Sequence, residues 1–468
     1  MKTEMNFMIS EEELNLADKS VDMALEAGAS AVQVTLDKAR TEIYALLNGE
    51  MDNIRQTGDR ALTFRVFADG KYGVFSTNRL DEDSVRDLLV KAVENVRLLA
   101  PDKFRRLPDP EDTASDAVRG DELELCWKEF DSVTAEEKLK MAERVSVFGE
   151  FSAASDDRPW RLISEEVEYN DTLTDTYLTS SDRIHCRQTE TSFEVCSSVT
   201  VEDNDGNKYS GLWWDYSISP EKVLASDCGH KAVMQAAAQI GQTRISGGKY
   251  TMAVSNRVSG RLLQPVLNAL AGMSIQQQSS FLTGSLEKRV FSKGLDVVDR
   301  PREKGKSGSI LFEEDGRTCL DRDIIREGVV KEYFINTYMS GKMGVPATSG
   351  TANRPVVLPF ISRELLRGEN SIDLKKIDER EILELCGSGI LVTDFNGGNC
   401  NQATGDFSYG VEGFIFNDGK ITSPVSGMLI TGNMTELWSS LLAAGSDPVD
   451  GMSRQVPTLA FRNVDFNA

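Results

Sequence analysis

The sequence has few histidines: only His185 and His230 occur in 468 residues. Metal sites in hydrolases usually need one or two imidazoles together with carboxylates or thiolates. His185 adjoins Cys186 on a predicted strand, where neighbouring side chains point to opposite faces. Cys228 and His230 lie two apart on a predicted helix and also face apart. Neither pair can chelate one ion, so we expect both histidines to be structural.

Basic residues are also scarce. Lys and Arg number 52 against 74 Asp and Glu, which gives a net charge of -22. Such a balance repels phosphate backbones, so direct nucleic-acid binding would need a local basic patch. The best candidate, Arg300–Lys306, is diluted by Glu303 and is predicted to be a solvated loop. We therefore expect protein rather than nucleic-acid partners.

Long apolar runs and paired cysteines are missing as well. No run approaches the roughly 18 residues of a membrane span, and Met1–Glu13 is polar and acidic, unlike a secretory leader. The cysteines are odd in number, scattered and without a CxxC pair, as is typical of reduced thiols in a cytoplasm. They are Cys126, Cys186, Cys196, Cys228, Cys319, Cys386 and Cys400. We predict a cytoplasmic protein that does not cross a membrane.

Common catalytic motifs are absent too. The sequence has no Gly-x-Ser-x-Gly elbow, and Ser246–Lys249 lacks the first glycine of a phosphate-binding loop. The residues alone therefore assign no chemistry.

The order of the predicted elements indicates an α+β protein. A capping box at Ser10 and Glu13 predicts a helix to about Ala27, and Asp69-Gly70 predicts a hairpin turn. Thr134 and Glu137, again three residues apart, begin a second helix predicted over Thr134–Phe148. Further helices are predicted over Ser84–Leu99, Ser219–Ile240, Ser259–Leu270 and Thr435–Ala443. Strands are predicted over Ala31–Leu36, Glu42–Leu47, Ala61–Phe67, Lys71–Ser76, much of Arg161–Trp214 with a turn at Asn204–Gly206, Tyr250–Ser255, Ser309–Phe312, Val356–Leu358, Ile390–Phe395, Val411–Phe416 and Ile421–Ser423.

These elements fall into two predicted domains. Residues 1–245 form an N-terminal helix–sheet domain that contains a proline-rich, linker-like segment at 101–121. Residues 246–468 form a β-rich domain, because short strands and Gly-rich turns dominate there. Such a pattern predicts a curled or barrel-like mixed sheet.

One stretch, Gly397–Gly413, is unusually rich in glycine and in polar side chains. Dense glycines let the backbone turn sharply or approach another group closely. Asn399, Asn401, Thr404 and Asp406 could then direct oxygens and amides into one space. A binding or interface loop and a structural set of bulges and turns are both consistent with this composition.

Two catalytic readings of this stretch find little support. Cys400 as a nucleophile would need a histidine from the other half of the chain as its base. Asp406 and Glu412 could form a carboxylate pair, but their spacing also fits a solvated hairpin.

The same stretch carries a family resemblance. Gly397–Asn401 followed by Thr404–Gly413 resembles the PmbA/TldE branch of the TldD/PmbA family, whose members are also called modulators of DNA gyrase. Supporting segments are Ser279–Leu282, Pro424-Val425, Thr431–Met434, Gly445–Pro448 and Pro457–Leu459. The resemblance is strong from about Gly241 onward and implies a two-domain α+β subunit that dimerises.

The resemblance also implies a missing metal site. The TldD branch is a zinc peptidase with a His-Glu-x-x-x-His helix and a late cysteine. Gln264, Pro265 and Ala269 fall where the first His, the Glu and the second His would be, and Asp450–Ser453 offers no cysteine. Amide and methyl groups cannot hold catalytic zinc. We therefore expect no metal or cofactor on this chain, with zinc only on a TldD-like partner.

Three hypotheses follow from the resemblance. The first is a non-catalytic subunit that pairs with a TldD-like zinc peptidase and helps to enclose unfolded or small peptides. The second is a homodimeric binding or regulatory protein acting through protein contacts. The third keeps hydrolysis on this chain through Cys400. Under the first, Asn399, Cys400, Asn401, Thr404 and Asp406 belong to a chamber-lining or interface loop.

Overall fold

A computed structural model describes residues 7–155, 157–366 and 373–467 and divides them into two compact units. The first contains the chain up to Ala237 together with Arg302–Cys319 and Thr337–Val345. The second contains Ala238–Pro301, Leu320–Asn336 and the chain from Pro346 onward. The division is not continuous in sequence, because two later segments return to the first unit.

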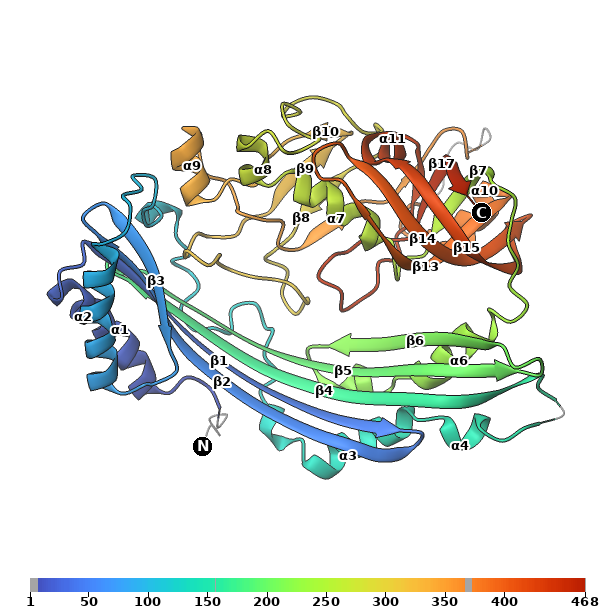
Figure 1. Cartoon of the computed structure of the whole chain (residues 1–468), viewed down its shortest axis with the longest axis horizontal. Coiled ribbons are helices and arrows are strands. Elements are labelled where there is room, and N and C mark those ends of the chain that lie inside the picture. Colours follow the sequence, from blue (N-terminus) through green and yellow to red (C-terminus); the bar gives the residue numbers. More distant parts are fainter. Residues whose placement is uncertain (1–6, 156, 367–372, 468) are drawn as a thin grey trace. The chain divides into compact units, whose positions relative to one another are not determined.

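The first unit is built on a six-stranded antiparallel sheet with the order β3-β2-β1-β4-β5-β6 (Figure 1). The strands are β1 Ala31–Leu47, β2 Glu50–Ala68, β3 Lys71–Thr77, β4 Trp160–Ser180, β5 His185–Asp203 and β6 Lys208–Ser217. The predicted hairpin is confirmed: Ala68 pairs with Lys71 across Asp69 and Gly70, which both have positive φ. The predicted break between Leu36 and Glu42 is wrong, since β1 runs straight through it.

Apolar residues on one face of this sheet form two buried clusters of the first unit. Val34, Phe64 and Val93 belong to one fully buried cluster, and Tyr169 and Phe193 belong to a second. The helices of this unit are α1 Glu11–Glu26, α2 Glu82–Val96, α3 Ala135–Val145, α4 Phe148–Phe151, α5 Pro220–Leu224, α6 Cys228–Ala237 and α9 Thr337–Met343, with 3₁₀ turns at Pro110–Asp112 and Phe130–Ser132. Capping boxes begin α1 and α3 as predicted.

The single helix expected over Ser219–Ile240 is two helices in the structure. The chain breaks between α5 and α6, where Ser226 Oγ donates to Asp215 (2.8 Å) and accepts from the N–H of Cys228 (3.2 Å). Serine and aspartate favour such side-chain bonds over continued helix.

The linker-like segment is irregular but packed. Ala117, Gly120 and Leu125 accept hydrogen bonds from the N–H groups of Arg187 (2.6 Å), Thr189 (2.9 Å) and Thr191 (3.0 Å). Residues 117–125 therefore cover the edge of β5 where β6 does not pair with it. Leu311 and Phe312 pack into the same cluster as Ala117 and Leu125, so the expected strand Ser309–Phe312 is instead a covering loop.

The second unit contains a closed mixed barrel, which confirms the predicted fold class. β7 Gly248–Val254, β13 Gly389–Cys400, β14 Asp406–Asn417, β15 Lys420–Asn433 and β17 Leu459–Asn467 follow one another around it, and β17 pairs with β7 to close it. β7 and β13 are parallel and the other pairs are antiparallel. β16 Leu441–Ala444 and β12 Phe360–Ile361 extend this sheet beyond the barrel.

In the described part of the second unit, a smaller sheet and four helices accompany the barrel. The sheet has the order β10-β9-β8-β11, formed by Val329–Val330, Arg322–Arg326, Val297–Asp299 and Pro355–Val357. The helices are α7 Gly260–Ala269, α8 Gly272–Gln276, α10 Glu379–Cys386 and α11 Met434–Ser439. The helix predicted to reach Ala443 ends at Ser439, because the following residues form β16. None of the helices in the described ranges is long and apolar enough to cross a membrane.

Candidate functional site

Gly397–Gly413 is mostly paired strand rather than loop. Residues up to Cys400 continue β13, and residues from Asp406 begin β14, so Asn401–Gly405 alone forms the tip of a long hairpin. The pairing slips between Val392 and Asp394 and again between Phe395 and Gly397. Of the two alternatives left open by the sequence, the set of bulges and turns describes the conformation correctly.

Polar side chains fix the tip to the start of α11. Asp406 accepts hydrogen bonds from Asn433 Nδ2 (3.0 Å) and Thr404 Oγ1 (2.7 Å), which hold the pKa of its carboxyl below the usual value. Asn433 Nδ2 also donates to the Thr404 carbonyl (2.9 Å), and Asn401 Oδ1 accepts from the N–H of Ala403 (2.9 Å). These side chains orient the backbone. Asn399, in the stem, is exposed.

The carboxylate pair considered above does not form, because each acid has its own partners. Glu412 accepts a hydrogen bond from Asn396 Nδ2 (3.0 Å), whereas Asp406 is held by Thr404 and Asn433.

The histidines are engaged within the first unit. His185 Nδ1 lies 2.8 Å from the Tyr177 hydroxyl, and His230 contacts Asp227 (2.8 Å) and Glu150 (3.1 Å). Among the described residues, no three His, Cys, Asp or Glu side chains form a group suited to a metal ion.

Cys400 is half-buried beside the tip. Burial and the negative charge of Asp406 raise the pKa of its thiol above the ordinary value. Since the thiolate is the reactive form of cysteine, this environment suppresses reactivity at neutral pH. The surroundings of Cys400 are therefore not those of an activated cysteine nucleophile, whose thiol pKa is lowered.

We predict that iodoacetamide labels Cys400 several-fold more slowly in the native protein than in the denatured chain at pH 7.5. The raised pKa leaves less thiolate in the native state, and partial burial slows access further. Peptide-resolved mass spectrometry measures the rate at this one cysteine. A native rate equal to or above the denatured rate would instead indicate an activated thiol.

A polar face of α7 lies against the hairpin stem. Arg261, which is exposed, donates from Nη2 to the Gly398 carbonyl (3.5 Å), and its guanidinium lies 5.7 Å from the centre of the Tyr409 ring. One turn further along, Gln264 Nε2 donates to Asn268 Oδ1 (2.6 Å). Spacings of three and four residues place these three side chains on one side of the helix. They present a guanidinium and two amides beside the hairpin.

This α7 face has unused hydrogen-bonding capacity. Gln264 Oε1 is shielded from solvent and has no hydrogen-bond partner among the described residues. Burial and nearby Cys400 raise the pKa of Tyr409 to about 12, so its hydroxyl remains a neutral donor. Guanidinium, amide and phenol groups match the carbonyl and carboxylate groups of a peptide. The sequence singled out Gln264 but not Arg261, Asn268 or Tyr409.

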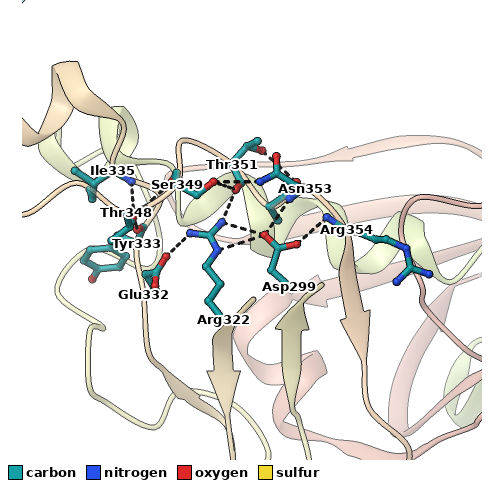
Figure 2. A network of polar contacts seen from close by, with 11 residues as sticks. Asp299, Arg322, Glu332, Tyr333, Ile335, Thr348, Ser349, Thr351, Asn353 and Arg354 are labelled. Carbon is teal, nitrogen blue, oxygen red and sulfur yellow. Dashed lines mark hydrogen bonds and ion pairs between the residues drawn. The ribbon is translucent and has the colours of Figure 1, made fainter. Parts of the chain in front are cut away.

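A buried ion network around Asp299 and Arg322 joins the strands of the smaller sheet to the segment before β11 (Figure 2). The Asp299 carboxylate is fully buried and accepts from Arg322 Nη2 (3.2 Å) and from the N–H groups of Asn353 (3.0 Å) and Arg354 (2.7 Å). Arg322 also donates to Glu332 and to the Thr351 carbonyl.

The network reaches α7 through Phe334. The Arg322 guanidinium lies 5.0 Å from the centre of the Phe334 ring. The Phe334 backbone bonds to Leu270 (2.9 Å) and Gly272 (2.8 Å) just beyond the helix. These contacts fix where α7 ends and therefore how its polar face meets the hairpin.

A cavity of about 480 Å³ lies beside the hairpin on the flank of the barrel. Phe407, Thr431 and Asn433 line it together with residues of α11 and β17. Lys249 and Asp465, which lie 3.6 Å apart, also line it. Asn433 therefore belongs both to this cavity and to the contacts that hold the tip.

Known proteins resemble this chain over nearly its whole length. Residues 247–468 match the family model described as PmbA/TldA metallopeptidase C-terminal domain, and residues 34–96 match PmbA/TldA metallopeptidase domain 1. A candidate modulator of DNA gyrase from Bacteroides thetaiotaomicron, known as a crystal structure, is 32% identical, with a TM-score of 0.89 and coverage of 98% of this chain and 100% of that chain. This chain belongs to the PmbA/TldD family.

More distant members agree with this assignment. The metalloprotease PmbA homologue of Haemophilus influenzae is 26% identical over 440 residues, which is 92% of this chain and 90% of that protein. The crystal structure of TldE from Thermococcus kodakarensis covers 97% of this chain and 100% of that chain, with a TM-score of 0.78 and 14% identity, which shows the shared fold.

The PmbA/TldD family includes metallopeptidases, but α7 of this member does not offer zinc ligands. Pro265 and Ala269 are buried in the core and carry no donor atom, and Gln264 offers only an amide. Zinc sites use imidazole, thiolate or carboxylate groups. The residues of this helix therefore do not fit the metal.

Proposed function

We propose that this chain is the non-catalytic subunit of a peptidase assembly that acts on unfolded or small peptides. A TldD-like zinc metallopeptidase would supply the metal and the hydrolytic step. The observation that supports the proposal is the composition of α7, which contains no imidazole, thiolate or carboxylate group and lies beside a polar hairpin. By the family resemblance, Gln264, Pro265 and Ala269 occupy the places of the zinc-helix His, Glu and His. The free thiols of the chain favour a location in the cytoplasm. Its net negative charge favours assembly through contacts with other proteins.

In this assembly the α7 face would hold peptide substrate. Arg261, Gln264 and Asn268 present donors beside the Gly398 stem, and Gln264 Oε1 can accept a backbone N–H. The fixed tip around Asn401, Thr404 and Asp406 would then line the chamber or meet the partner. This chain would orient the peptide while its partner cleaves it.

Mixing this chain with the TldD-like protein of its own organism should give a zinc-containing complex that digests a flexible peptide. The Arg261→Ala variant should assemble normally but raise KM several-fold, because one charged donor to the peptide is lost. Arg462→Ala is the matched control, since it removes an exposed arginine that pairs with Glu364 (2.9 Å).

Two results would contradict the proposal. One is full activity of the TldD-like subunit alone with no complex on gel filtration. The other is stoichiometric, tightly held zinc in the purified chain, because α7 offers no ligands for it.

A second candidate function is a homodimeric regulatory protein. The observation that favours it is the 32% identity to the Bacteroides protein named as a candidate modulator of DNA gyrase. The net charge of -22 argues that such regulation would act through protein contacts. Capture of gyrase by this chain without any TldD-like subunit would favour this candidate over the first.

A further inference from the structure

A cavity of about 450 Å³ in the first unit has no part in the proposed peptide site. Residues of α3, of α5 and of the segment 127–133 line it. Trp127, Met141 and Leu224 supply apolar surface, and Arg144 and Glu221 supply charges of opposite sign. Small-molecule sites are typically concave and apolar, with a few polar groups that orient the ligand. This cavity has that composition.

The core beneath the cavity holds its walls in place. The Trp127 ring packs edge-on against buried Phe193, with 5.6 Å between the ring centres. Met141 is buried in the same cluster as Phe193, which anchors α3. On α5, Val223 is buried, whereas Leu224 is 42% exposed and presents apolar surface. Walls that are already ordered reduce the entropic cost of binding a ligand.

Two charged side chains of the cavity are available to a ligand. In the part of the chain that the structure describes, neither Arg144 nor Glu221 makes an ion pair or a side-chain hydrogen bond. Two other charged residues that line the cavity are engaged: Lys140 Nζ lies 2.5 Å from Glu136, and Glu137 belongs to the capping box of α3. One cation and one anion therefore remain for a ligand.

The positions of these two charges at helix ends do not account for the cavity. Arg144 lies in the last turn of α3 and Glu221 in the first turn of α5, where charges of these signs complement the helix dipoles. This placement explains the sign of each charge. A charge that serves only a helix end does not need an apolar cavity beside it.

We propose that this cavity binds a small zwitterion with a large apolar side chain, either a free amino acid or a dipeptide. The Arg144 guanidinium donates to the ligand carboxylate, which it can bind through two parallel hydrogen bonds. The Glu221 carboxylate accepts from the ligand ammonium. The apolar surface of Trp127, Met141 and Leu224 contacts the ligand side chain.

Isothermal titration calorimetry on the isolated chain tests the ligand class. The probes are phenylalanine and the dipeptide leucyl-phenylalanine, and at least one should bind one-to-one with a Kd of about 1 mM or tighter, as expected for ligands of this size. The tighter probe distinguishes a free amino acid from a dipeptide. Glycine and glycylglycine should bind at least about tenfold more weakly, because they lack the apolar side chain.

Two variants assign each charge to one end of the tighter probe. Arg144→Gln should weaken its binding at least about tenfold, through loss of a charged hydrogen bond, but should not affect its C-terminal amide, which has no carboxylate. Glu221→Gln should weaken the unmodified probe similarly but should not affect its N-acetyl form, which has no ammonium. Glu143→Gln is the matched control, since this exposed side chain adjoins Arg144 but lies outside the cavity lining, and it should bind like the wild type.

Three results would overturn the inference. They are no saturable binding of either probe up to about 10 mM, equal affinity for the probes and their glycine counterparts, and an unchanged affinity in either charge variant. The inference does not rest on the peptidase role, because binding is measured on this chain alone. A chain that binds a probe in this way without ever joining a zinc peptidase would support it and contradict the proposed function.

Discussion

Arg322→Ala should lower the free energy of unfolding by about 3 to 5 kcal/mol, the usual cost of leaving a buried charge without its partner. Asp299 has no exposed side-chain surface, and Arg322 is the cation that contacts it through both Nε (3.3 Å) and Nη2 (3.2 Å). Arg322 also holds Glu332 and the Thr351 carbonyl, so its loss frees the segment before β11 as well.

Arg300→Ala is the matched control for this prediction. Arg300 pairs with Asp321 at 3.3 Å, but both side chains are substantially exposed, so the change should cost at most about 1 kcal/mol. Chemical denaturation of the two variants measures the difference. Similar midpoints would mean that the buried network contributes no more than a surface pair.

Gly413→Ala should destabilise the barrel by about 3 kcal/mol, at the upper end of overpacking costs. A Cβ at this position would lie 1.8 Å from the Leu391 carbonyl oxygen on the adjacent strand. That oxygen belongs to the backbone of β13, so relief requires the two strands to separate. The expected result is a lower denaturation midpoint with native-like spectra at low denaturant.

Gly260→Ala is the matched control, because the added methyl group meets nothing within 4 Å at the first residue of α7. It should be neutral or stabilise slightly, since alanine restricts the unfolded chain more than glycine does. If Gly413→Ala unfolds at the same denaturant concentration as this control, the close contact between β13 and β14 is not the reason for the glycine.

Local signals predicted much of the fold. The capping boxes at Ser10 and Thr134 and the Asp69-Gly70 turn each depend on a few neighbouring residues, and the structure reproduces all three. Such patterns can be recognised in the sequence, because the residues that form the stabilising hydrogen bonds lie within four positions of one another.

Long-range pairing explains what the sequence did not show. β1 was expected to break after Leu36, but Asp37–Thr41 are held in the sheet by pairing with both β2 and β4. The sequence predicted a barrel-like mixed sheet but not which strands pair to close it. The closing pair is β7 and β17, which lie far apart in the chain. Likewise, residues 302–319 join the first unit through contacts that no local pattern records.

The candidate site also depends on long-range contacts that the sequence does not show. Gln264 and the tip residues Asn401, Thr404 and Asp406 could be singled out from composition and family resemblance. The importance of Arg261 depends on its packing against Tyr409 of the hairpin, a contact between distant parts of the chain that no local pattern records. Helical spacing linked Arg261, Gln264 and Asn268, but it could not show that this face meets the hairpin rather than solvent.

The closed barrel also constrains the order of folding. β7 is synthesised first among its five strands and β17 last, yet the two must pair to complete the barrel. Until β17 emerges, one side of β7 and the matching part of β15 remain unpaired and able to recruit other chains. Contacts so distant in sequence slow folding, because the intervening chain must be ordered first. The barrel should therefore close only after β17 has been synthesised, and until then the nascent chain should depend on chaperones more than the closed barrel does.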